Sequence, residues 1–332
     1  MHIVAKFCLG IESTAHTFGV GIVDSQGNVL ANERSTYNPK KGTGFIPAEM
    51  AEHHTQNALK IMELALKKSK LKIENIDTIA FSQGPGIPNA LRVGAAIARY
   101  IACKYDHQLI GVNHCIAHIE IGRLTTKCID PVILYLSGGN TQVIAFAENR
   151  YRIFGETQDI AVGNAIDNMA RYIALQFPYG PSFDETAAKG KKYIELPYVV
   201  KGMDLSFSGI LTAAKKKFKT GASKADTCYS FQETCFAMLT EVTERALAHT
   251  GKKEVLLVGG VAASKRLQEM VKAMCEARGA KVYIVPKEFS GDQGAMIAWA
   301  GLLACKSGQK TKIENSDIIQ KWRTDEVDIV WR

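Results

Sequence analysis

The spacing of apolar and polar positions predicts strands that alternate with helices along the whole chain. Residues 5–33 hold three apolar stretches separated by a polar turn at Glu12–Thr17 and by the turn SQGN, a pattern typical of a three-stranded meander. Residues 47–70 carry apolar side chains at helical spacing. This order predicts α/β layers around a mixed sheet. The elements expected next are a strand over 76–82, a helix over 91–105, a strand over 108–113 and a short helix from His114.

The same succession begins a second time after residue 130. Residues 131–157 again read as strand, polar glycine turn, strand and strand, and residues 253–286 add a strand, a Gly-Gly turn, a helix and a further strand. A chain of 332 residues is too long for one ordinary core and suits two domains of about 150 residues. We therefore predict two related lobes, 1–130 and 131–292, with a C-terminal helical segment of about 293–332 rejoining the first.

Composition narrows the class of protein. No apolar run is long enough to span a membrane, and the first residues do not resemble a secretory signal. The eight cysteines stand singly with no CxxC pair, which favours a reduced cytoplasm over a zinc ribbon or a disulfide scaffold. A net charge of +8 permits a polyanionic partner without requiring one. The densest basic run, Lys215–Lys219 followed by Lys224, is read most simply as a solvated helix end.

Three turns rich in small residues each follow an apolar strand, at residues 10–19, 134–143 and 256–267. Glycine and serine at such turns let backbone N–H groups approach an anion closely. None of the three matches a Walker A or a GxGxxG motif, and in the third the Gly-Gly pair is expected to open a helix. Taken together, in matching positions of two lobes, they predict a nucleotide cleft between the lobes.

The segment GVNHCIAHIEI places His114 and His118 four residues apart. On a helix this spacing puts both imidazoles on one face, as two ligands of one ion require, but such pairs are also common in packed cores. Residue spacing alone leaves both interpretations open. The neighbouring residues His53 and His54 point to different faces of a helix, so we expect that pair to be solvated.

Eight segments distributed over the whole chain resemble the archaeal and eukaryotic-type tRNA threonylcarbamoyladenosine transferases. This family forms the catalytic subunit of the KEOPS complex and was formerly described as O-sialoglycoprotein endopeptidases. The segments run in the same order as in that family from the first strand to the last residue: GIEST, GVNHCIAHIE, LYLSGGNTQV, FGETQDIAVGNAIDNMAR, DLSFSGILTAA, LLVGGVAAS, SGDQGAMIAW and RTDEVDIVWR.

The resemblance implies a duplicated actin/hexokinase/Hsp70-like (ribonuclease H-like) fold. It also implies transfer of a threonylcarbamoyl group from threonylcarbamoyl-AMP to the adenosine next to the anticodon, in tRNAs that read codons beginning with A. The partners implied are tRNA, a small kinase/ATPase subunit, a dimerising subunit and a regulatory subunit, with a separate synthase supplying the donor. The expected location is the cytoplasm, with no membrane partner.

The resemblance further implies one divalent ion, iron or zinc, and an adenine nucleotide, either threonylcarbamoyl-AMP or ATP with magnesium. His114, His118 and Asp292 match the family's metal ligands, and Tyr135 is expected to approach the ion through its hydroxyl. The remaining matches are to residues that hold the nucleotide: Tyr135, Leu136, Ser137, Gly138 and Gly139 at the phosphate end, Asp167, Gly180 and Asp184 at the ribose and base, and Ser264 at the adenylate.

Three of these neighbourhoods depart from the family's spelling. Ser264 stands where the family usually has asparagine, Gln293 replaces the usual asparagine after the metal aspartate, and Tyr179 replaces a glycine. None of these departures removes an expected metal ligand.

Two other classes of function were weighed against this resemblance. A zincin protease needs HExxH, but Cys115 follows His114 and cannot activate a metal-bound water. A nucleotide-dependent switch, ATPase or small-molecule kinase of the same fold would bind magnesium through carboxylates and water, and would not need the two imidazoles.

Overall fold

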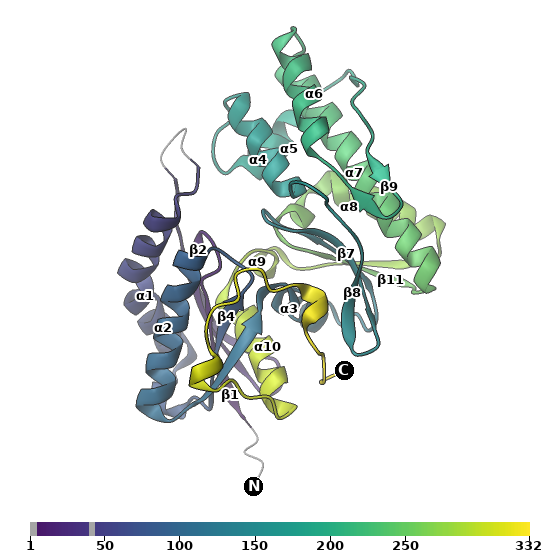
Figure 1. The fold of residues 1–332 in the computed structure, drawn as a ribbon. Helices are drawn as coiled ribbons and strands as arrows, with labels where there is room; N and C mark the ends of the chain where they lie inside the picture. Colours follow the sequence, from purple (N-terminus) through teal and green to yellow (C-terminus); the bar gives the residue numbers. More distant parts are fainter. Residues whose placement is uncertain (1–4, 40–43) are drawn as a thin grey trace. The chain divides into compact units, whose positions relative to one another are not determined.

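The computed structural model describes residues 5–39 and 44–332 and divides the chain into two compact units. Unit 1 contains the residues up to Leu124 together with Gly291–Arg332, and unit 2 contains Thr125–Ser290. The chain therefore leaves unit 1, builds unit 2 and returns (Figure 1). Asp292 falls in unit 1, whereas the boundary predicted from the sequence places it at the end of the second lobe, 131–292.

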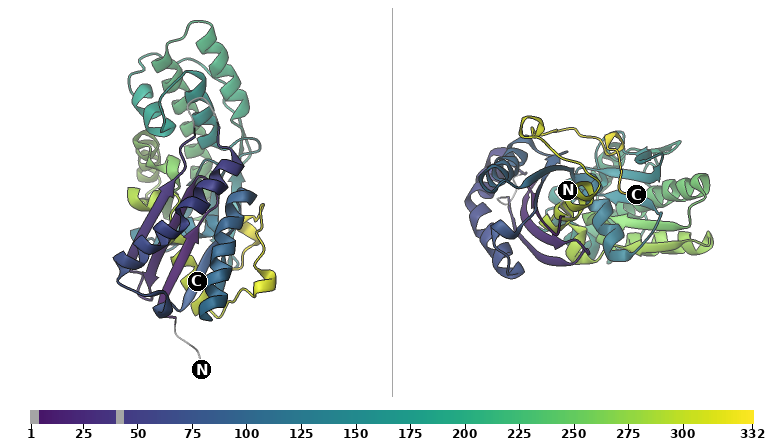
Figure 2. Two further views of the ribbon diagram at one scale, coloured as in Figure 1. Left: turned by 90° about the vertical axis from the view of Figure 1, so that its left-hand side faces the viewer. Right: turned by 90° about the horizontal axis from the view of Figure 1, so that it is seen from below.

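Unit 1 is built on a five-stranded mixed sheet in the order β3-β2-β1-β4-β5. Strands β1, β2 and β3 form the antiparallel meander, and β4 and β5 continue the sheet parallel to β1. Helices α1 and α2 pack against each other and against the sheet, and Figure 2 shows them side by side. The bounds are β1 Phe7–Glu12, β2 Thr17–Asp24, β3 Val29–Thr36, β4 Thr78–Gly84, β5 Gln108–Asn113, α1 Pro47–Ser69, α2 Pro88–Tyr105, α3 His114–Thr126 and α10 Gly294–Lys306.

Alternation along β1 explains how the sheet of unit 1 is covered on both faces. Leu9 and Ile11 belong to the core that also contains apolar side chains of α1 and α2. Gly10 points to the other face, where a Cβ added to it would lie 2.1 Å from the backbone nitrogen of Ala298 in α10. Gly21, its partner on β2, approaches Ala295 equally closely. The two glycines let α10 lie directly on the strands, which fixes where the chain re-enters unit 1.

Unit 2 repeats the strand order of unit 1, with β12-β11-β6-β7-β8 in place of β5-β4-β1-β2-β3. Strands β6, β7 and β8 are antiparallel, and β11 and β12 run parallel to β6. The duplication predicted from the sequence is therefore confirmed at the level of topology. The bounds are β6 Val132–Leu136, β7 Thr141–Ala147, β8 Arg150–Glu156, β11 Glu254–Val258, β12 Lys281–Ile284, with a small hairpin of β9 Val200–Lys201 and β10 Asp204–Leu205.

The helices of unit 2 enclose one apolar core with this sheet, centred on side chains such as Phe183, Phe231 and Phe236. The Gly-Gly turn after β11 differs from the prediction, because a 3-10 turn over Gly260–Ala263 intervenes and α8 begins only at Lys265. The helices are α4 Val162–Tyr172, α5 Tyr179–Ala187, α6 Ser208–Lys219, α7 Lys224–Thr250, α8 Lys265–Ala277 and α9 Lys287–Ser290.

The expectation for the pair His53 and His54 was wrong for one of its members. His54 is fully buried and its Nε2 lies 2.9 Å from the carbonyl oxygen of Ala15. His53 is half-buried, with Nε2 2.9 Å from the hydroxyl of Ser35. Amphipathic spacing placed the pair on a helix, but the packing of α1 on the β2–β3 meander encloses His54.

Among the described residues, no helix has the length and apolar character needed to cross a bilayer.

Candidate metal centre and nucleotide-binding segments

The two histidines of the candidate metal centre stand at the start of α3, directly after the buried strand β5. Asn113 ends that strand, and its Oδ1 accepts hydrogen bonds from the backbone N–H groups of Cys115 at 3.0 Å and Ile116 at 3.2 Å. A side chain that caps the first turn in this way fixes the position where the helix begins. His114 and His118 then lie one turn apart on the same face of α3, as the spacing predicted.

Asp292 reaches the histidines from the short connection between α9 and α10. The following residue, Gln293, caps α10 by accepting from the backbone N–H of Met296 at 3.2 Å. Arg34 on β3 donates to the backbone carbonyl of Asp292 at 3.3 Å. Both contacts hold the backbone at this residue, so the carboxylate is presented by a fixed turn.

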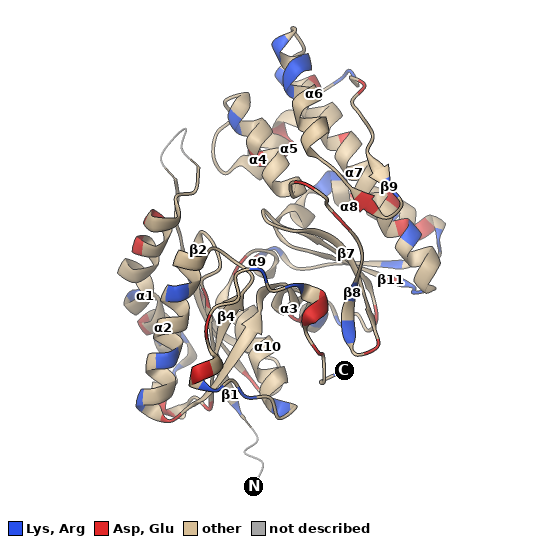
Figure 3. Ribbon diagram, viewed as in Figure 1, with Lys and Arg blue, Asp and Glu red and all other residues tan. Residues whose placement is uncertain are grey.

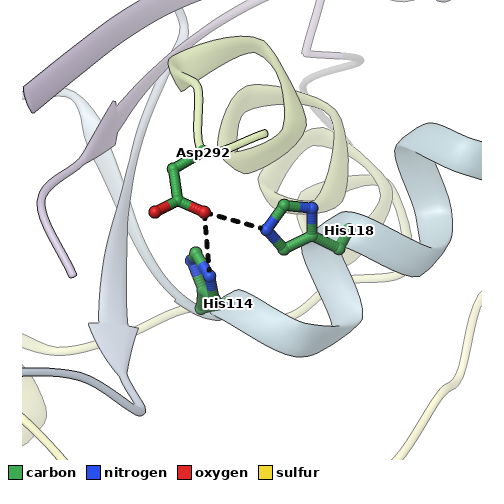
Figure 4. A group of neighbouring side chains, drawn as sticks. All are labelled: His114, His118 and Asp292. Carbon is green, nitrogen blue, oxygen red and sulfur yellow. Dashed lines mark hydrogen bonds and ion pairs between the residues drawn. The ribbon is translucent and has the colours of Figure 1, made fainter. Parts of the chain in front are cut away.

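Both imidazoles face a single oxygen of Asp292, as Figure 4 shows. The Oδ1 atom of Asp292 lies 3.2 Å from Nε2 of His118 and 3.5 Å from Nε2 of His114. One ligand atom from each residue falls within 4.8 Å of the others. The two histidines are buried and the aspartate is half-buried. Three side chains separated by up to 178 positions in sequence thus converge on one point within unit 1.

The charges at this point are strongly coupled. Burial acts to lower the pKa of His114, but the adjacent Glu12 and Asp292 carboxylates outweigh it and raise the pKa to about 9. Burial lowers the pKa of His118, and the hydrogen bond to Asp292 offsets this only in part. Burial would raise the pKa of Asp292, but its hydrogen bond to His118 and the two imidazoles hold that pKa well below its ordinary value. The aspartate is therefore a carboxylate at neutral pH.

Glu12 also belongs to this centre, although the sequence pattern assigned it no role. It ends β1, is fully buried, and its Oε2 lies 3.0 Å from Nδ1 of His114. Its Oε1 accepts from the backbone N–H of Thr14 at 2.7 Å, and the hydroxyl of Thr14 lies 3.3 Å from the same imidazole nitrogen. The available signal was a glutamate at the end of an apolar strand, where a charged side chain is rarely buried without a partner.

The donor set fits a transition metal. Two imidazoles and one carboxylate are ligands that zinc and non-haem iron both accept, with further positions left for substrate. Because the pKa of His114 is about 9 in the metal-free protein, a metal would bind its Nε2 by displacing a proton at neutral pH. Glu12 accepts the Nδ1 proton of His114, which fixes the tautomer and leaves Nε2 for a metal. Carboxylates that orient metal-binding histidines in this way are a common feature of such sites.

The first nucleotide-binding segment predicted from the sequence is the β6–β7 turn of unit 2. Ser137 accepts from the backbone N–H groups of Gly139 at 3.3 Å and Asn140 at 3.0 Å. A Cβ added at Gly138 or Gly139 would meet no atom within 4 Å. Gly259, at a φ of 94°, lies against the carbonyl of Leu136 and brings the turn after β11 beside this one. The two turns thus meet, with open space over the glycines.

The remaining predicted nucleotide residues fall on helices of unit 2. Asp184 on α5 accepts from Nε2 of Gln232 at 2.6 Å, and burial raises its pKa while the nearby side chains of Ser264 and Gln232 oppose the rise. The structure therefore brings Asp184 and Ser264 together. Asp167 lies on α4, and Gly180, on the first turn of α5, has open space around its Cα.

Tyr135 is fully buried on β6 in unit 2, whereas the three clustered ligands belong to unit 1. Its expected contact with the ion stays a prediction, as do the nucleotide roles of the unit 2 residues and the cleft between the lobes.

Comparison with known proteins decides the family. A profile of the tRNA N6-adenosine threonylcarbamoyltransferases (TsaD) matches residues 28–299. The tRNA N6-adenosine threonylcarbamoyltransferase of Thermococcus kodakarensis is 55% identical over 324 residues, which cover 97% of this chain and 99% of that protein. The chain belongs to this family. The resemblance drawn from the eight sequence segments is thereby confirmed.

Another relative is longer than this chain. The probable bifunctional tRNA threonylcarbamoyladenosine biosynthesis protein of Methanocaldococcus jannaschii is also 55% identical, over 98% of this chain but only 60% of its own length. Among solved structures, T. kodakarensis HypF aligns with a TM-score of 0.67 at 17% identity, over 91% of this chain and 48% of HypF. Component A of the (R)-2-hydroxyglutaryl-CoA dehydratase of Acidaminococcus fermentans aligns at 0.59 and 14% identity, over 90% and 98%. These likenesses confirm the actin/hexokinase/Hsp70-like fold.

Proposed function

We propose that this chain transfers a threonylcarbamoyl group from threonylcarbamoyl-AMP to the N6 amine of the adenosine next to the anticodon, in tRNAs that read codons beginning with A. Near-complete alignment with relatives named for this reaction supports the class. The observation that carries the proposal further is the convergence of His114, His118 and Asp292, because a family transferase with this donor set is equipped for metal-assisted acyl transfer.

The chemistry asks for positioning and charge stabilisation more than for acid catalysis. The N6 amine forms a bond to the carbamoyl carbon while the bond from that carbon to the phosphate oxygen of AMP breaks. AMP is a good leaving group, but the amine is a weak nucleophile because its lone pair is delocalised into the ring. We infer that the open turn at Ser137–Gly139 accommodates the phosphate and that Asp184 accepts a hydrogen bond from the ribose.

We infer that His114 and His118 hold a divalent ion, iron or zinc, through Nε2, and that Asp292 holds it through its carboxylate. Such an ion, when bound, supplies a Lewis acid that polarises an oxygen of the donor. Glu12 holds the Nδ1 proton of His114, and the capped start of α3 keeps both imidazoles on one face. The buried surroundings strengthen these electrostatic interactions relative to water.

The partners follow from the same assignment. We infer that the chain acts with a small kinase/ATPase subunit, a dimerising subunit and a regulatory subunit, and receives its donor from a separate synthase. The bifunctional name and greater length of the M. jannaschii relative support an associated second activity. Exposed lysines at the end of α6, including Lys216, Lys217 and Lys219, offer a basic surface to tRNA phosphates (Figure 3).

The test supplies unmodified tRNA, the donor-synthesising system and the partner subunits, and then measures threonylcarbamoyladenosine by mass spectrometry of the digested tRNA. We expect product that depends on this chain. His114→Ala should abolish product and lower the metal content of the purified protein while retaining tRNA binding. His249→Ala, which alters an exposed histidine of unit 2, is the matched control. Undiminished turnover in His114→Ala would refute the metal role, and no product from the wild type would refute the reaction.

A further inference from the structure

Unit 1 carries a group of aromatic rings that none of the roles above uses. The ring of His16 lies 5.1 Å from that of Phe45, measured between centroids, and the ring of Tyr37 lies 6.5 Å from Phe45. The hydroxyl of Tyr37 donates to Glu49 on α1, which holds its ring in place. We name His16, Tyr37 and Phe45 the aromatic cluster. Phe45 remains 41% exposed, although an apolar side chain of this size is usually buried.

The aromatic cluster lies beside the candidate metal centre along the chain and in space. His16 comes two residues after Thr14, whose hydroxyl lies 3.3 Å from Nδ1 of His114. The backbone N–H of Tyr37 donates to the carbonyl of His16 at 2.7 Å, which ties the two aromatic residues together at the end of the β2–β3 hairpin. On the same hairpin, the exposed Arg34 donates to the carbonyl of Asp292. A cation, the exposed ring of Phe45 and the half-buried rings of His16 and Tyr37 therefore adjoin the proposed metal ligands.

This combination has a chemical counterpart in single-stranded RNA. Proteins read unpaired bases of RNA loops by stacking them on aromatic side chains and on arginine, while cationic groups hold the adjoining phosphates. Histidine, tyrosine and phenylalanine offer flat faces that tolerate any base. We propose that the aromatic cluster and Arg34 form a docking site for an unpaired nucleobase of the substrate RNA loop and its adjoining phosphate. The proposal rests on the proposed function, since it supplies the contact that holds the loop near the reacting adenosine.

A purely structural role for Phe45 makes a different prediction. Phe45 precedes Ile46, the residue that caps α1, and from this position an apolar side chain can pack on the first turn of a helix. Leucine preserves such packing but has no ring to stack on a base. Phe45→Leu therefore separates the two roles. Tyr100→Leu is the matched control, because Tyr100 is an exposed ring on α2, 62% accessible and outside the aromatic cluster.

The experiment measures binding of the full chain to an anticodon stem-loop RNA and to a fully paired duplex of the same length. We expect Phe45→Leu to weaken stem-loop binding by about fivefold to a hundredfold, the range for loss of one base stack, with a smaller effect on the duplex. Arg34→Gln should make the salt dependence of stem-loop binding shallower by about 0.7 in log–log slope, one phosphate contact on a single strand. Thermal unfolding of each variant verifies that it is folded.

Stem-loop binding of Phe45→Leu within twofold of the wild type overturns the proposal, as does an equal loss on stem-loop and duplex. Loss of association with a partner subunit while RNA binding is unchanged also overturns it and assigns the rings to a protein contact. In the transfer assay the effect should appear as a raised KM for tRNA rather than for the donor. A wild type that binds the stem-loop through these residues but forms no threonylcarbamoyladenosine would refute the proposed function and leave the docking site standing.

Discussion

Replacing Glu12 with glutamine tests whether this buried carboxylate controls the charge of His114, a proposed metal ligand. Oε2 of Glu12 lies 3.0 Å from Nδ1 of the imidazole, and Oε1 accepts from the backbone N–H of Thr14. Glutamine keeps the shape, but it has one acceptor oxygen in place of two and carries no negative charge. The lost acceptor lowers stability by an amount that does not depend on pH, so the pH-dependent part of the change reports the charge. The pKa of His114 in the metal-free protein should therefore fall from its raised value.

The size of the effect follows from the pKa of His114, which is about 9 in the folded protein against an ordinary value of 6.5. A raised pKa of this kind stabilises the folded state fully below pH 6.5, and the contribution is lost as the pH rises through 9. This net shift corresponds to about 3 kcal/mol, which remains after burial has opposed the attraction of Glu12 and Asp292 for the imidazolium. Between pH 6.5 and about 9.5, the free energy of unfolding of the wild type should thus fall by up to about 3 kcal/mol relative to that of Glu12→Gln.

Urea unfolding of both proteins with a metal chelator present, at the two pH values, measures this difference directly. Taking the difference between proteins cancels every titration that they share. Glu120→Gln is the control: Glu120 is another buried glutamate of unit 1, but it pairs with Arg123 at 2.8 Å, which stays charged over this range. Glu120→Gln should change the free energy of unfolding by the same amount at both pH values. A difference between wild type and Glu12→Gln that does not change with pH would refute the electrostatic role.

Three further predictions concern other parts of the molecule. The double variant Lys216→Glu with Lys217→Glu, which reverses two exposed charges, should weaken tRNA binding measured by filter binding. The slope of log affinity against log salt concentration should fall by about 1 per lost phosphate contact, and an unchanged slope would show that these lysines do not contact phosphates. His54→Gln should make the free energy of unfolding less sensitive to acid. Because burial lowers the pKa of His54 to about 4, the wild type loses up to about 3 kcal/mol of this free energy as the pH falls from 6.5 through 4. Gly21→Ala should lower the free energy of unfolding in urea by at least about 1–3 kcal/mol, because its Cβ would lie 2.1 Å from the backbone of α10. The control Gly209→Ala has open space around its Cβ on a helix, and should raise the free energy of unfolding by about 0.5–1 kcal/mol.

Much of the fold could be predicted because it depends on patterns among residues that are close together in the sequence. Alternating and helical spacing identified the meander, its repetition and the helices α1, α2, α3, α8 and α10, but not the helices α4 to α7. The likeness of strand order between the two sheets reflects that repetition. The histidine pair was found for the same reason, since a spacing of four places two side chains on one helix face. His54 escaped this reasoning, because its burial depends on which strands cover α1 and not on its own helix.

The rest of the candidate site depends on contacts between distant segments. Asp292 lies 174 residues from His118, and no local pattern relates them; only the family resemblance placed the aspartate with the histidines. Glu12 lies 102 residues from His114 and was missed, because the resemblance assigned it no role. The aromatic cluster was missed for a related reason: Phe45 joins His16 only when the meander and the start of α1 are folded together.

The order in which the units are written into the chain has a consequence for synthesis on the ribosome. Strands β1 and β2 bear glycines whose nearest neighbours on one face of the sheet belong to α10, which emerges after all of unit 2 has been translated. During synthesis, one face of the central sheet of unit 1 therefore stays uncovered until unit 2 and α10 have been translated. Capture of the proposed divalent ion should coincide with closure of that sheet, since Asp292 leaves the exit tunnel together with α10. Incomplete chains would then carry no loaded centre, which links metal uptake to successful assembly of the whole molecule.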